Sequence, residues 1–331
     1  MAPPKEITDF KFRYCRNGKP AGLFATKGSI GDDGLGLGAS RVPWHAVVDT
    51  TTRDDRLLLV VQAGVELDKD ATKSLVDGCA LVLAPNGVKA LDLERAIDRR
   101  ASRAEVARTK VRLEAEGRLS EFRTITCPHC DATVNLSAFA ETRHVFCRFC
   151  DTVFMGRTRA VVTDHEHRTC SECNLFDRVR GYTEFYFYFL LVVYGFSYKR
   201  RHLCDNCVGR LFWKVLLINS IFVLGVAPAV WMKVKSMTGR SPKTKTLAAG
   251  NAKARKGDAA GADALYAQVF KELPEHPGVL LNQAQAHFKA GDGDGGARCL
   301  RRSLDSCSNY VPTLGLLAAL AEGQPPPAQL T

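Results

Sequence analysis

Residues 127–207 contain the motif Cys-x-x-Cys four times, as Cys127-Pro128-His129-Cys130, Cys147-Arg148-Phe149-Cys150, Cys170-Ser171-Glu172-Cys173 and Cys204-Asp205-Asn206-Cys207. Two thiolates separated by a tight turn hold one side of a metal ion, and two such pairs complete a tetrahedron around Zn²⁺. The eight cysteines therefore predict two four-cysteine sites and two zinc ions per chain. Four sulfur ligands leave no position for a substrate or an activated water, so the motifs predict binding and scaffolding rather than catalysis.

The spacing between the pairs predicts two different modules. The first two pairs are separated by 16 residues, which is typical of a structural zinc ribbon and predicts one over residues 124–160. The last two pairs are separated by 30 residues, so a second four-cysteine module over residues 165–210 has to contain an insert.

That insert includes an uncharged aromatic and β-branched run from Phe185 to Tyr194. A membrane span is one interpretation, but the whole uncharged stretch, residues 185–198, has only about fourteen residues, which is short for a helix that crosses a bilayer. A single crossing would also place Cys173 and Cys204 on opposite sides of the membrane, where they could not share one metal. The composition favours strands, and we expect a β-hairpin, although a second membrane span over residues 184–198 stays open at this point.

A stronger membrane signal follows, because residues 215–232 form an uncharged run of eighteen residues. A helix of that length measures about 27 Å, close to the thickness of the hydrocarbon core. Trp213 and Trp231 lie at the two ends of the run, where aromatic rings favour the membrane interface. We therefore expect a transmembrane helix over residues 211–235, with basic flanks that attract anionic lipid head groups. A buried core helix or a re-entrant segment is the alternative.

Residues 1–120 read as a small β domain closed by a helix. Phe10, Phe12 and Tyr14 alternate with charged residues, as in a half-buried strand, and two apolar runs at residues 42–48 and 57–61 predict a hairpin. After Asn86-Gly87 the period changes to that of a helix ending near Gly117. This element order resembles bacterial pleckstrin-homology-like domains, and the resemblance implies an interaction or membrane-proximal module.

After a predicted linker at residues 236–246, residues 247–323 contain an internal repeat, and residues 324–331 form a proline-rich tail. Gly257-Asp258 and Gly291-Asp292 lie 34 residues apart, the period of tetratricopeptide repeats. The chain resembles that family further at Ala262, Tyr266 and Pro274. The resemblance implies helix pairs whose groove takes a peptide or a partner helix. So few repeats also imply docking to another element or self-association.

The first helix of the second repeat carries the predicted partner-binding residues. Asn282, Gln285 and Lys289 are spaced at i, i+3 and i+7, which places them along one helix face. Polar side chains with this spacing suit the backbone or the terminal carboxylate of an extended peptide. Ordinary solvation of a helix exterior explains the same pattern equally well.

The net charge of +11 is concentrated in the middle of the chain, where residues 126–245 carry +8. Zinc sites made of four thiolates are dianionic, so many of these Arg and Lys residues can neutralise them. A nucleic-acid footprint is the weaker interpretation. Cysteines kept reduced for metal indicate a cytosolic environment.

Together these segments predict a multi-domain α+β protein: a β domain, two zinc-ribbon-like modules, a membrane helix and tetratricopeptide-like helix pairs. This order resembles bacterial membrane proteins of uncharacterised type that combine zinc ribbons with such repeats. We expect a membrane-anchored adaptor with its zinc modules facing the cytoplasm, in a bacterial inner membrane, and a protein or peptide partner. The alternatives are a nucleic-acid-binding zinc-ribbon protein and, third, a thiol-disulfide oxidoreductase. Phosphate-binding loops, nucleophile elbows and metalloprotease motifs do not occur in the sequence, so we do not predict an enzyme.

Overall fold

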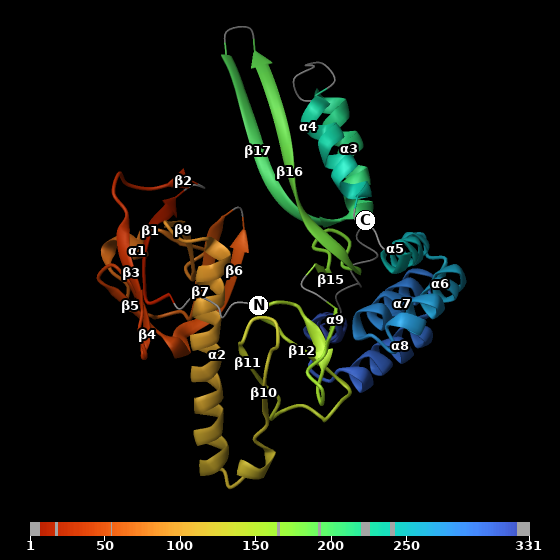
Figure 1. Ribbon diagram of the computed structural model, residues 1–331, viewed down its shortest axis with the longest axis horizontal. Coiled ribbons are helices and arrows are strands. Elements are labelled where there is room, and N and C mark those ends of the chain that lie inside the picture. Colours follow the sequence, from red (N-terminus) through yellow and green to blue (C-terminus); the bar gives the residue numbers. More distant parts are fainter. Residues whose placement is uncertain are drawn as a thin grey trace. The chain divides into compact units, whose positions relative to one another are not determined.

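The computed structural model of the protein describes residues 7–16, 19–53, 55–163, 166–190, 193–219, 226–238 and 242–322. The chain divides into two compact units, residues 1–138 and residues 139–331 (Figure 1). The fold is mixed α+β, with an antiparallel sheet in the first unit and helices toward the end of the second.

The first unit is built on an antiparallel sheet of order β5-β4-β3-β1-β9-β7-β6, in which β2 also pairs with β1 and β8 with β9. Its strands are β1 (Asp9–Arg16), β2 (Lys19–Pro20), β3 (Thr26–Ile30), β4 (Gly34–Leu37), β5 (Ser40–Pro43), β6 (Val47–Arg53), β7 (Arg56–Val61), β8 (Leu75–Val76) and β9 (Ala80–Asn86). Phe10, Phe12 and Tyr14 of β1 are buried, as their alternation predicts. The predicted hairpin is the β6–β7 pair, but its first strand begins only at Val47, because residues 42–43 belong to β5 and residues 44–46 form a 3-10 turn.

The long helix α2 (Ala90–Ala115) packs against this sheet, and the short α1 (Lys69–Thr72), η1 (Trp44–Ala46) and η2 (Leu119–Glu121) complete the unit. Leu93 and Ile97 of α2 are fully buried in the core that the sheet forms. The buried carboxylate of Asp98 accepts a hydrogen bond from the Thr50 hydroxyl and so ties the helix to β6. Gly117 follows the helix with φ +68°, a left-handed conformation that favours glycine and ends helices.

Short strands surround the Cys-x-x-Cys motifs. They are β10 (Thr124–Thr126), β11 (Thr133–Asn135), β12 (His144–Phe146), β13 (Val153–Met155), β14 (Val161–Thr163) and β15 (His167–Thr169). The insert between Cys173 and Cys204 forms the long antiparallel strands β16 (Phe176–Leu190) and β17 (Val193–Cys204), paired from Val179 with Cys204 to Leu190 with Val193. The hairpin interpretation of this run therefore agrees with the structure.

The predicted membrane helix over residues 211–235 needs correction. The structure places α3 (Asp205–Asn219) and α4 (Val226–Met237) in this region, and the two helices contact each other and β16 (Figure 1). Residues 220–225, in the middle of the apolar run, lie outside the described residues. None of the helices in the described part of the chain combines the length and the apolar character needed to cross a membrane.

The C-terminal helices are α5 (Pro242–Ala254), α6 (Ala259–Glu272), α7 (Pro277–Lys289), α8 (Gly293–Ser306) and α9 (Val311–Ala321). α6 and α8 begin 34 residues apart, as do α7 and α9, so the repeat period is structural. Asp258 and Asp292 cap α6 and α8 by accepting hydrogen bonds from Gly261 N–H and Gly295 N–H. The predicted linker at 236–246 is instead occupied by the end of α4 and the start of α5, while the tail at 324–331 lies outside the described residues.

Candidate metal centres

Three of the four cysteine pairs share one backbone turn. In each, the N–H of the first cysteine donates to the carbonyl five residues later: Cys127 to Ala132, Cys147 to Thr152 and Cys170 to Leu175, at 2.9–3.0 Å. The residue after the second cysteine has a positive φ, namely Asp131 (61°), Asp151 (57°) and Asn174 (55°). Asp and Asn adopt this conformation more readily than most residues. The turn leaves the two sulfurs of a pair on one side of the loop.

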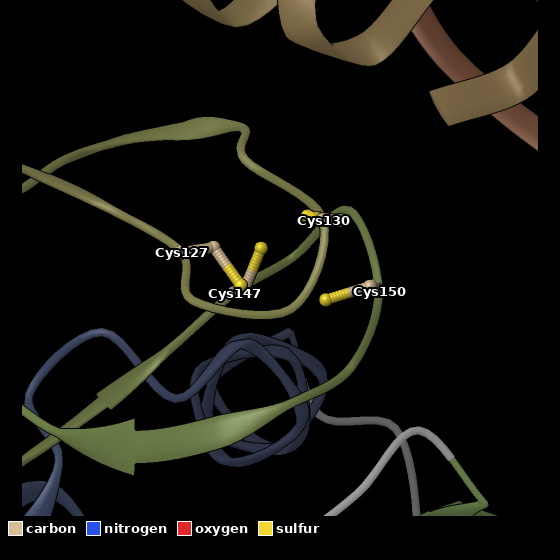
Figure 2. Close-up of side chains that lie close together, drawn as sticks. All are labelled: Cys127, Cys130, Cys147 and Cys150. Atoms are coloured by element: carbon tan, nitrogen blue, oxygen red, sulfur yellow. The ribbon is translucent and has the colours of Figure 1, made fainter. Parts of the chain in front are cut away.

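The turns bring the eight predicted cysteines into two groups among the residues that the structure describes. In the first, the Sγ atoms of Cys127, Cys130, Cys147 and Cys150 all lie within 4.8 Å of one another. Figure 2 shows these side chains gathered around one point from two loops. The Cys127 sulfur also accepts a hydrogen bond of 3.4 Å from the N–H of His129, so that residue contributes its backbone to the turn.

The second group contains Cys170, Cys173, Cys204 and Cys207, again with all sulfurs within 4.8 Å of one another. The pair Cys204 and Cys207 does not form the turn of the other three pairs, because α3 begins at Asp205 between the two cysteines. A helix N-terminus favours negative charge, so it stabilises the thiolate of a cysteine in its first turn. The N–H of Cys204 donates to the Cys170 sulfur at 3.4 Å and links the two halves of the group.

The sulfur spacing fits a metal of zinc's size. A tetrahedron with metal–sulfur bonds of about 2.3 Å has sulfur–sulfur edges of about 3.8 Å. The distance between the Cys173 and Cys204 sulfurs is 3.8 Å. In each group three cysteines are buried and one, Cys150 or Cys173, is partly exposed, so most of each group is shielded from solvent. The residues present therefore suit a closed metal site with four cysteine ligands.

The electrostatics of the second group also favour thiolates that share a cation. Hydrogen bonds from Cys173, Cys204 and Cys207 lower the pKa of the Cys170 thiol, whereas neighbouring cysteine sulfurs raise the pKa of Cys204. Four sulfurs this close do not all ionise without a compensating positive charge. Arginines supply part of it: Arg210 donates to the Cys207 sulfur at 3.8 Å and Arg255 to the Cys173 sulfur at 3.7 Å. Some of the basic residues thus neutralise the cysteine cluster, as the charge distribution predicts.

The C-terminal helices hold the segment next to the second group through its backbone. The N–H of Phe176 donates to Asn282 Oδ1 and Asn282 Nδ2 donates to the Phe176 carbonyl, both at 2.7 Å. Asn251 of α5 donates to the same carbonyl at 3.0 Å and accepts from Asn282 and from the Tyr266 hydroxyl at 2.8 Å. The Phe176 side chain is buried beside the His276 ring, with ring centroids 4.6 Å apart.

A parallel contact holds the strand that leads into Cys147. The N–H of Phe146 donates to Asn309 Oδ1 at 3.0 Å and Asn309 Nδ2 donates to the Phe146 carbonyl at 2.8 Å. The Phe146 ring packs edge-on against Tyr310, and the buried His144 lies 2.8 Å from the Ser306 hydroxyl. One asparagine therefore binds both backbone groups of one phenylalanine beside each cysteine group.

The predicted partner-binding residues require correction. Asn282 and Gln285 are buried, and Gln285 Nε2 donates to the Asn174 carbonyl at 2.8 Å, so both bind the chain's own segment 174–176. Lys289 is half-buried at the end of α7 and takes no part in these contacts. In the structure the backbone that Asn282 and Gln285 bind is intramolecular, so neither side chain faces an external peptide.

The structure also shows residues that the sequence reasoning missed. Asn251 and Asn309 are buried hydrogen-bonding partners, and Asn or Asp follows the second cysteine in three of the four motifs. The Asn or Asp after the second cysteine could have been recognised in the sequence, because the positive φ at that position favours these residues. The contact of Asn309 could not be predicted from the sequence, since its partner Phe146 lies 163 residues away.

A nucleic-acid-binding ribbon needs aromatic side chains on which bases can stack, and Phe146 and Phe149 are the two candidates in the first ribbon. Phe146 is buried against Tyr310 and therefore cannot stack on a base. The guanidinium of Arg148 lies 4.9 Å from the centre of the Phe149 ring. This arrangement weakens the alternative of a nucleic-acid-binding ribbon.

No protein-family model, curated protein or solved structure matches the chain.

Proposed function

We propose that the protein is a non-enzymatic scaffold in which two zinc ions and the tetratricopeptide-like helices together fix the segments beside the cysteine groups. The observation that carries this proposal is the paired contact of Asn282 with Phe176 and of Asn309 with Phe146. Each contact joins the helices α5–α9 to a segment next to a cysteine group. The helices thus bind backbone segments of their own chain, where tetratricopeptide repeats would bind a peptide from a partner.

Zinc supports the scaffold without supplying chemistry. Four cysteines would hold each ion and leave no site for a substrate, so the metal contributes folding free energy rather than reactivity. The buried sulfurs, the arginine donors and the shared turn all suit that role. A partner would then bind a surface of residues 139–331 that these internal contacts leave exposed.

The test is metal analysis of the full-length protein, combined with limited proteolysis before and after chelation. We expect two zinc ions per chain, and we expect chelation to open cleavage sites in α5–α9 as well as in the cysteine loops. The helices should become sensitive because they lose the segments that fill their buried polar positions. Fewer than one zinc per chain, or helices that resist protease equally well without metal, would contradict the proposal.

A further inference from the structure

The arm of the second unit, defined as β16, β17, α3 and α4, exposes large apolar side chains on its two helices. Trp213 is 67% exposed and Leu217 is 74% exposed on α3, while Trp231 is 70% exposed on α4. The opposite side of α3 is buried, since Val208, Leu211 and Val215 pack with Tyr182 of β16. Large apolar side chains therefore lie on two sides of α3. The exposed ones mark an interaction surface.

Basic residues accompany the exposed apolar ones. Arg210, Trp213, Lys214 and Leu217 are spaced at i, i+3, i+4 and i+7, which places them on one face of α3, and all four are exposed. Over residues 176–237 the sequence contains nine Lys and Arg and three acidic residues. Two of those acids, Asp177 and Asp205, are buried. The sequence of the arm is therefore strongly basic, although Arg178 and Arg180 are largely buried in ion pairs with Glu166 and Asp205.

The far end of the hairpin has the complementary composition. Residues 185–190 and 193–198 contain no charged residue, and Lys199-Arg200-Arg201 follow directly in β17. Six residues of strand extend about 20 Å. One leaflet of hydrocarbon is about 15 Å thick. An uncharged strand end of this length is therefore sufficient for one leaflet and too short to cross a bilayer.

We propose that the arm docks onto the surface of an anionic lipid bilayer, with Trp213, Leu217 and Trp231 in the interface and Lys214 on the lipid phosphates. Tryptophan favours the head-group region and basic side chains gain from anionic lipid, so the two residue types suit this one partner. The proposal deepens the scaffold function by assigning its external surface, and it rests on that function.

Other occupants fit the arm less well. A second copy of the arm would bring like charges together. A nucleic acid would satisfy the positive charge but would not bury an exposed aliphatic side chain such as Val234. A bilayer satisfies both properties of the surface at once.

The experiment is sedimentation of the zinc-loaded full-length protein with vesicles of phosphatidylcholine alone or with one third phosphatidylglycerol. We expect binding to the anionic vesicles, at least tenfold weaker binding to the neutral ones, and quenching of tryptophan fluorescence by lipids with brominated acyl chains. The double variant Trp213→Ser/Leu217→Ser should weaken binding at least tenfold. Both residues are exposed, so the zinc content and the thermal midpoint should stay unchanged.

The matched control removes exposed apolar residues from the first unit. Leu23 and Phe24 are 91% and 88% exposed, and Leu23→Ser/Phe24→Ser should leave vesicle binding unchanged. Loss of binding in this control would overturn the assignment to the arm. Full zinc content with no binding to anionic vesicles, or binding to single-stranded DNA in its place, would overturn the membrane proposal while leaving the scaffold intact. Loss of zinc would instead contradict the scaffold itself.

Discussion

The two cysteine groups reach similar sulfur geometry through different local structures. Both halves of the first group are loops closed by a hydrogen bond from the N–H of the first cysteine to the carbonyl five residues later, whereas the second group combines one such loop with the N-terminus of α3. The second group also receives hydrogen bonds from Arg210 in α3 and from Arg255, which follows α5. The comparison indicates that the first group takes its four cysteines from loops, whereas the second takes one pair from the start of a helix.

The largest expected effect separates the two groups by their metal. Cys147→Ser should remove the first zinc and leave the second, because no residue of the second group lies in that loop. Cys204→Ser should remove the second zinc and also destabilise the base of the hairpin and the start of α3. Binding of structural zinc releases on the order of 10 kcal/mol in small domains. Elemental analysis should give one zinc per chain in each variant.

Two zinc ions in either variant would show that the cysteine in question is not a ligand. Loss of both ions from Cys147→Ser would show that the groups fold together, and would contradict the independence of the first.

The asparagine contacts sharpen the comparison at the next level. Asn282→Ala should lower the free energy of unfolding by about 2–4 kcal/mol, because it leaves the N–H and the carbonyl of Phe176 less satisfied in a buried place. Asn309→Ala should cost less, since Asn309 lacks the additional bond that Asn282 makes with Asn251. Chemical denaturation measures both.

Lys289→Ala is the matched control on the same helix as Asn282, and it should change stability by less than about 0.5 kcal/mol. A loss in this control as large as that in Asn282→Ala would show that the effect of Asn282 is not specific to its contact.

A substitution at Gly278 tests the packing of Phe176. A Cβ atom at this position would lie 2.5 Å from the Phe176 ring, so Gly278→Ala should cost about 1–3 kcal/mol through overpacking. Gly315→Ala in α9 is the control, because open space surrounds that position and alanine favours a helix by about 1 kcal/mol. Thermal unfolding should lower the midpoint in the first variant and raise it in the second. Equal midpoints would contradict the close packing.

The smallest expected effect is a pH dependence of the free energy of unfolding, caused by His144 near the first cysteine group. Burial lowers the pKa of His144 to about 4, from an ordinary value of 6.5. The unfolded chain therefore takes up a proton below pH 6.5 that the folded chain does not, and stability falls between pH 6.5 and pH 4. At pH 5 this loss amounts to about 2 kcal/mol. In His144→Gln the fall in stability over this range should be smaller by that amount, and an unchanged pH profile would show that His144 is not the responsible group.

The sequence predicted the elements whose signals are local. The Cys-x-x-Cys spacing identified all eight clustered cysteines, and the uncharged aromatic run from Phe185 predicted the hairpin. The 34-residue spacing of Gly-Asp predicted helices because glycine ends one helix and aspartate caps the next.

The errors concern contacts between distant segments. An apolar run at residues 215–232 has the same composition whether it forms one helix or parts of two, and contact with β16 is not encoded in its periodicity. Asn282 and Gln285 had the right chemistry for binding a backbone. Their partner, residues 174–176, lies more than 100 residues away, so spacing along α7 could not distinguish it from an external peptide.

The central claim is that the C-terminal helices hold the backbone next to both cysteine groups, and hydrogen exchange tests it most directly. The measurement follows the amide protons of Phe146 and Phe176 in the zinc-loaded full-length protein, with residues of α7 as the reference. We predict that both amides exchange as slowly as those in the centre of α7, because each donates to a buried asparagine. Exchange of either amide as fast as that of an exposed loop would contradict the claim.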